Sequence, residues 1–99
     1  MKSFKFKNIK KVTWPVEMPN GTQLTIRQPT KADADVLASV LNTTDIDEIY
    51  AGVGYILNCN QEGIVIEQKE LEQHFDFQDL AAFLQGYTDF LNESSNVKN

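Results

Sequence analysis

Apolar residues recur with a helical period over the last quarter of the chain. They fall on one side of a helical wheel at Phe77, Leu80, Ala81, Phe83, Leu84, Tyr87, Phe90 and Leu91. Polar residues fill the other side, and Asp76 stands where a helix N-cap is expected. The pattern predicts a long amphipathic helix over residues 76–93. Its leucines form the centre of the apolar stripe, and Phe83, Tyr87 and Phe90 form an aromatic edge.

Residues 12–28 instead alternate between apolar and polar, with turn residues in the middle. The run Met18-Pro-Asn-Gly21 has proline at a favoured turn position, and glycine where a left-handed residue is needed. A three-residue loop with a glycine bulge would pair Trp14 with Ile26 and Val16 with Leu24. This register gathers one apolar face, made of Val12, Trp14, Val16, Met18, Leu24 and Ile26. We therefore predict a β-hairpin with Trp14 buried between it and the helices.

A shorter alternation, Phe4-Lys-Phe-Lys7, precedes the hairpin. It has two interpretations, a third strand on the hairpin edge or a mobile arm that awaits a partner. We favour the strand, because a two-stranded hairpin alone is only marginally stable.

The middle of the chain carries helix signals. Thr30 can cap a helix over residues 30–42, and Asp45 with Glu48 forms a capping-box pair for a helix that ends near residue 57. Gly52 and Gly54 in that second helix suggest close approach of another backbone, and Tyr55 points away from its apolar stripe. A short helix is expected over residues 67–75.

The predicted fold class is therefore α+β, with an N-terminal antiparallel hairpin of two or three strands packed on a bundle of three to four α-helices. Residues 1–93 form a single domain, with a basic arm or edge strand over 1–11, the hairpin over 12–28 and the helical part over 30–93. Residues 94–99 are polar and are expected to be a disordered tail.

Charge is distributed unevenly along the chain. Formal net charge is −5; residues 1–11 hold five lysines and no acid, whereas residues 45–93 hold eleven acids and one lysine. An acidic body argues against nucleic acid as a partner. The basic end either contacts an acidic neighbour or this chain's own acidic half, and we expect weak self-association through it. The sequence has no long apolar run and no signal-peptide pattern, and a lone Cys59 suits a reducing cytoplasm.

Catalytic chemistry is poorly supported by the residue types present. His74 is the only histidine and lies among acids, and Cys59 lies in a polar loop without an obvious activating base. One cysteine and one histidine give no metal-site spacing, and there is no glycine-rich phosphate loop. We predict no catalytic, cofactor-binding or metal-binding residues, and a protein that is not an enzyme.

The order of features resembles a known family. The hairpin is followed by Ile56-Leu-Asn-Cys-Asn60, then Gly63-Ile-Val-Ile-Glu67, and finally an Asp-Leu-x-x-Phe-x-x-x-Tyr-x-x-Phe pattern at Asp79, Leu80, Phe83, Tyr87 and Phe90. Over roughly residues 12–93 this resembles the small tail assembly chaperones of long-tailed phages and prophages of Gram-positive bacteria. One departure is Ile66, where a serine or threonine cap would be expected before the short helix.

The resemblance implies a non-enzymatic role in the host cytoplasm. Such chaperones bind the long tape measure protein, keep it soluble and help recruit tail tube subunits, so both proteins are implied as partners. We expect the partner contact at Phe83, Tyr87 and Phe90, with Tyr55 as a second contact. The alternative is an acidic regulatory adaptor or inhibitor that binds another protein.

Overall fold

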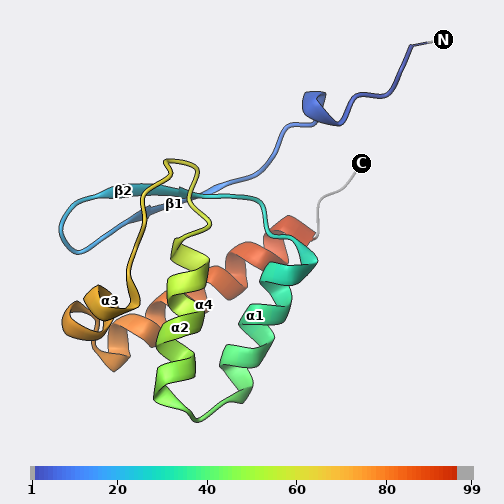
Figure 1. The fold of residues 1–99 in the computed structure, drawn as a ribbon. Helices are drawn as coiled ribbons and strands as arrows, with labels where there is room; N and C mark the ends of the chain where they lie inside the picture. The colour runs from blue at the N-terminus through green and yellow to red at the C-terminus, as the bar shows by residue number, and fades with distance from the viewer. Residues whose placement is uncertain (1, 96–99) are drawn as a thin grey trace.

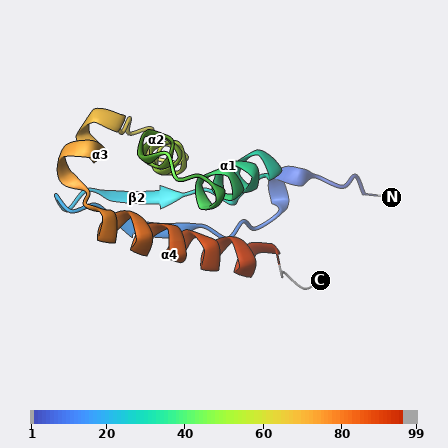
Figure 2. The same cartoon turned by 90° about the horizontal axis from the view of Figure 1, so that it is seen from below.

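The computed structural model describes residues 2–95 and has the predicted α+β fold (Figure 1). A 3₁₀ turn, η1, and a two-stranded antiparallel sheet are followed by four helices. In Figure 2, α4 lies on one side, α1 and α2 lie on the other, and β2 is seen between the two layers. The elements are η1 (Phe6–Asn8), β1 (Trp14–Glu17), β2 (Gln23–Ile26), α1 (Lys31–Asn42), α2 (Ile46–Leu57), α3 (Gln68–His74) and α4 (Phe77–Ser95).

The hairpin has the predicted register, with Trp14 opposite Ile26 and Val16 opposite Leu24. At the turn, the Gly21 amide donates to the Met18 carbonyl at 2.8 Å. Gly21 has a φ of 89°, a left-handed conformation that a side chain would strain. The turn predicted from the sequence is therefore confirmed. It could be predicted because the residues that determine it are neighbours in the chain.

The apolar face of the hairpin meets the helices, with one exception. Met18, Leu24 and Ile26 are buried, and Trp14 and Val16 are half-buried against the core. Val12 was expected on the same face, but it is exposed because β1 begins only at Trp14.

The loop after α2 covers the outer edge of β2. The Arg27 amide donates to the Cys59 carbonyl at 3.1 Å, and the Gln61 amide donates to the Thr25 carbonyl at 2.9 Å. The Asn60 side chain fixes this loop by donating to the Ile64 carbonyl and accepting from the Ile64 amide. The loop thus occupies the edge that a third strand could have used.

The N-terminal arm, residues 2–13, does not form the strand that we favoured. It runs away from the body (Figure 1), and its only regular element is η1. Phe4 and Phe6 are 72% and 75% exposed, and their rings meet only each other, edge to face at 4.8 Å. The remaining edge, on β1, carries Pro15, which has no N–H to donate to a further strand.

Helix starts follow the sequence closely. Thr30 caps α1 in a reciprocal capping box with Asp33, and Asp76 and Asp79 exchange the same pair of bonds at α4. Asp45 caps α2 as predicted, but the expected box with Glu48 is not reciprocal. Glu48 accepts instead from the Thr43 hydroxyl, which also accepts from the Asp45 amide.

One helix start agrees with the sequence, and one helix end differs from the prediction. No side chain caps α3 at Glu67, as the isoleucine at position 66 suggested. Helix α4 continues through Ser94 and Ser95, which were assigned to the polar tail, and Ser94 is buried. The rest of that predicted tail, residues 96–99, lies outside the described residues.

The two central helices cross closely at Gly52. A Cβ atom there would collide with the Cγ2 atom of Val40 on α1. The prediction that another backbone approaches this glycine is therefore wrong, because the atoms that lie close to it belong to side chains of α1. None of the helices within residues 2–95 has both the length and the apolar character to cross a membrane.

Candidate binding surfaces

The aromatic edge of α4 is occupied by Trp14. Its ring centroid lies 5.4 Å from that of Phe83, 5.9 Å from Tyr87 and 5.8 Å from Phe90. Gly86 lets the indole lie against the helix, because a Cβ atom at this position would be 2.9 Å from Trp14 Cζ2. The hairpin therefore covers the edge that we expected to face a partner.

Burial of these side chains corrects the predicted partner contact. Tyr87 is 1% exposed and Phe90 is 4% exposed, so neither offers a surface to another protein in this conformation. Phe83 is half-buried and lines a shallow hollow with Val16 and Ala82. The wide apolar stripe was recognised correctly from the sequence. A helical wheel contains no tertiary contacts, so it does not show which part of the stripe the hairpin covers.

Tyr55 is partly exposed, as predicted, but its hydroxyl serves an internal contact. It donates to Asp33 Oδ1 at 2.9 Å. This hydrogen bond is the main cause that raises the pKa of the Tyr55 phenol. The side chain is thus 40% exposed, while its hydroxyl is held by α1.

Asp33 is the centre of a buried polar cluster that the sequence did not reveal. The carboxylate is fully buried and pairs with Arg27, with Oδ2 to Nη1 and Oδ1 to Nη2 distances of 3.0 Å. Cys59 Sγ lies 3.4 Å from Arg27 Nη2 and 3.8 Å from Asp33 Oδ1. The cluster therefore joins the end of β2, the start of α1 and the end of α2.

The cluster suits a structural role rather than nucleophilic chemistry. Burial raises the pKa of the Cys59 thiol, and the neighbouring Asp33 carboxylate raises it further, so the thiolate is disfavoured. Among the described residues, no three histidine, cysteine, aspartate or glutamate side chains are grouped so that they could hold a metal ion.

Two of the concave surfaces formed by residues 2–95 are candidates for binding a partner. The first, which we call the α2–α4 groove, has a volume of about 230 Å³ and is almost entirely apolar. Ile46 and Phe77 at its mouth are 50% and 63% exposed. Its lining residues are Ile46, Ile49, Phe77, Leu80, Ala81 and Leu84.

Acidic residues adjoin both walls of the α2–α4 groove. Asp45 and Asp47 flank Ile46 at the start of α2, and Asp76 and Asp79 flank Phe77 and Gln78 at the start of α4. All four aspartates are exposed. The groove residues belonged to the two predicted helical stripes, and the signal that was missed is an apolar residue placed directly after each helix cap.

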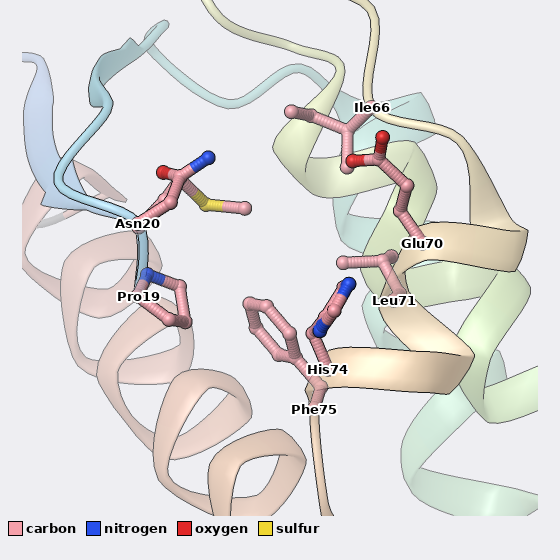
Figure 3. Close-up of a pocket in the computed structure, with 8 residues that line it drawn as sticks. Pro19, Asn20, Ile66, Glu70, Leu71, His74 and Phe75 are labelled. Atoms are coloured by element: carbon pink, nitrogen blue, oxygen red, sulfur yellow. The ribbon is translucent and has the colours of Figure 1, made fainter.

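The second surface is a pocket of about 420 Å³ between the hairpin turn and α3 (Figure 3). We call it the tip pocket. Pro19 and Asn20 stand on one side, and Glu70 and His74 of α3 face them from the other. Its buried floor is apolar, and its members are Met18, Ile66 and Leu71. Residues far apart in sequence form this pocket, so no local pattern could have indicated it.

Comparison with protein-family models, with curated proteins and with solved structures finds no match for this chain.

Proposed function

We propose that this protein binds an apolar helical segment of another protein and keeps that segment in solution. The observation that carries the proposal is the α2–α4 groove, an open apolar hollow of about 230 Å³ between two helices. Amphipathic helices commonly bind by laying their apolar face into such a groove. Exposed apolar side chains at its mouth, Ile46 and Phe77, provide the anchors that would contact the bound helix.

The resemblance to tail assembly chaperones makes the tape measure protein the expected partner. Long apolar helices aggregate in water unless their surface is covered. An acidic body that covers them would also keep the complexes apart by charge repulsion, since formal net charge is −5. The contact is assigned to the α2–α4 groove in place of Tyr87 and Phe90, because those two side chains are buried against Trp14.

The test is co-expression with the predicted tape measure protein of the same genome. The parent chain should hold that protein in the soluble fraction as a complex. Phe77→Ala and Ile46→Ala should weaken binding about tenfold or more each, because aromatic and aliphatic anchors carry much of an interface's binding energy. Both residues are exposed, so the variants should unfold at nearly the parent temperature.

Leu41→Ala is the matched control, because Leu41 is a similarly exposed aliphatic residue on α1 that does not line the groove. It should bind like the parent. A loss of binding in Leu41→Ala as large as in Phe77→Ala would reject the groove. Failure of the parent to hold the tape measure protein would reject the chaperone function and leave the acidic adaptor or inhibitor as the alternative.

A further inference from the structure

The N-terminal arm combines exposed aromatic side chains with positive charge. Phe4 and Phe6 are largely exposed and pack edge to face on each other, and Ile9 is exposed as well. Between residues 2 and 11 the arm carries five lysines and no acid. A segment with this composition gains free energy wherever its rings are buried and its lysines meet acids.

The tip pocket offers both features. Its floor is apolar, and its volume of about 420 Å³ lies within the range of roughly 300–1,000 Å³ that is typical of ligand pockets. Glu70 stands at the rim (Figure 3). Glu72 lies on the same short helix, Glu67 directly precedes it, and Lys69 is the only lysine of that helix.

The arm and the tip pocket lie at opposite ends of the molecule. In Figures 1 and 2 the arm leaves one end of the hairpin, and the turn with α3 forms the other end. An arm directed away from its own pocket is placed to meet the pocket of another copy. Such a contact joins two different surfaces, so it would extend head to tail from one copy to the next.

We propose that the arm of one copy binds in the tip pocket of a second copy, with Phe4 and Phe6 on its apolar floor and the arm lysines beside Glu70. The β1 edge is a poorer acceptor for the arm, because Pro15 lacks an N–H donor. The β2 edge is already paired with the loop at residues 59–61. This inference is independent of the proposed function, since it involves neither the α2–α4 groove nor a tape measure protein.

Sedimentation velocity over a range of protein concentrations tests the association. The parent should form dimers and larger species as concentration rises, and salt should weaken them because the lysine–glutamate contacts are exposed. Phe4→Ala with Phe6→Ala should raise the dissociation constant about tenfold or more. Glu70→Lys should also raise it, by placing like charge against the arm.

Mixing the two variants distinguishes head-to-tail contact from other modes. The Phe4→Ala/Phe6→Ala variant keeps an intact tip pocket, and Glu70→Lys keeps an intact arm. Together they should form dimers that do not grow further, because each dimer has one good contact and no complementary ends left. Val65→Ala, at an exposed apolar residue that does not line the pocket, is the matched control and should associate like the parent.

Three results would overturn the proposal. The parent could remain monomeric at every concentration, the arm variant could associate as strongly as the parent, or the mixture could show no recovery. If the arm instead bound in its own pocket, the parent would be a compact monomer at every concentration, which is the first of these three results. All substituted residues are exposed, so a thermal unfolding curve can verify that each variant is folded.

Discussion

At the scale of single residues, Trp14 and Gly86 form the contact that joins the hairpin to α4. The indole stacks on Phe83 and Phe90, with interplanar angles of 30° and 21°. This arrangement needs a residue without a side chain beneath the ring, and Gly86 supplies it. Because Trp14 is the chain's only tryptophan, its fluorescence reports on this contact alone.

Gly86→Ala should destabilise the protein. The added Cβ would lie 2.9 Å from Trp14 Cζ2 and would force the ring to move. Overpacking of this kind costs about 1–3 kcal/mol, against a gain of roughly 1 kcal/mol in helix propensity. Chemical denaturation followed by tryptophan fluorescence measures the difference.

Gly54→Ala is the control for that prediction. Its Cβ would meet Leu71 Cδ1 at an ordinary 3.4 Å, so the helix propensity gain of roughly 1 kcal/mol should remain. If Gly86→Ala were as stable as Gly54→Ala, with unchanged fluorescence, the indole would not rest on Gly86.

Tyr87 makes stability depend on alkaline pH. Burial raises the pKa of its phenol above the usual value of about 10, and the Asp33 carboxylate raises it further. The neutral form is favoured in the folded state, so stability is fully present below about pH 10 and is lost as pH rises toward the folded-state pKa.

Tyr87→Phe should therefore show a smaller loss of stability between about pH 9 and pH 11 than the parent. The midpoints of chemical denaturation, determined across this pH range, measure the loss of stability. Tyr50→Phe is the comparison, because the Tyr50 hydroxyl donates to the Phe75 carbonyl at 2.6 Å and its removal should lower stability at every pH. Parallel pH profiles for the parent and Tyr87→Phe would contradict the role of the Tyr87 phenol.

At the scale of secondary structure elements, Asp33 holds three segments together. It completes the capping box of α1, pairs with Arg27 just after β2, and accepts from Tyr55 near the end of α2. The other ion pair among the described residues, Lys31 with Asp35, is exposed on α1. The two aspartates are two residues apart but have different surroundings.

Asp33→Ala should cost about 3 kcal/mol, because it breaks the capping box of α1 and leaves Arg27 without its partner. The lower part of the usual range applies, since the Arg27 side chain is 39% exposed and water can solvate it. Asp35→Ala should cost about 0.5 kcal/mol or less. If thermal or chemical denaturation showed the same loss of stability for Asp33→Ala and Asp35→Ala, the buried cluster would not be what holds these segments together.

Features fixed by neighbouring residues could be predicted from the sequence. The hairpin turn needed only Pro19, Asn20 and Gly21, and the caps at Thr30 and Asp76 act within one helical turn. Features that depend on distant residues could not. The apolar stripe of α4 was predicted correctly, but its aromatic edge is packed against the hairpin instead of facing a partner.

The same limit explains the errors in the candidate sites. The arm was assigned to a sheet edge because it alternates and because a two-stranded hairpin alone is marginally stable. The loop at residues 59–61 and Pro15 leave no good edge for it. The α2–α4 groove depends on how far apart two apolar stripes lie, which periodicity does not measure. The tip pocket brings together the turn at residues 18–20 and α3, so only the tertiary fold defines it.

At the scale of the whole molecule, the protein is an acidic body with a basic arm that does not contribute to its core. Principal extents of 55 × 28 × 17 Å show how elongated the molecule is with the arm extended. Within residues 2–95, the buried apolar side chains form one cluster that includes no residue before the hairpin. Folding and association should therefore be separable by truncation.

Deletion of residues 2–11 should change the free energy of unfolding by no more than about 0.5 kcal/mol in dilute solution, because Phe4 and Phe6 are largely exposed to solvent. Self-association should be lost. A drop in unfolding temperature at low concentration would contradict this and would mean that the arm packs on its own body.

The deletion also removes five lysines and takes formal net charge from −5 to −10. Greater repulsion between bodies could by itself weaken association at low salt, so the truncation alone does not identify the contact. Phe4→Ala with Phe6→Ala leaves the charge unchanged, and its loss of association should persist at about 0.5 M salt, where repulsion between exposed charges is largely screened. Two results together would contradict the proposal: salt restores association of the truncated chain to the parent level, and the phenylalanine variant associates like the parent. Charge alone would then govern self-association, and the arm would not bind in the tip pocket.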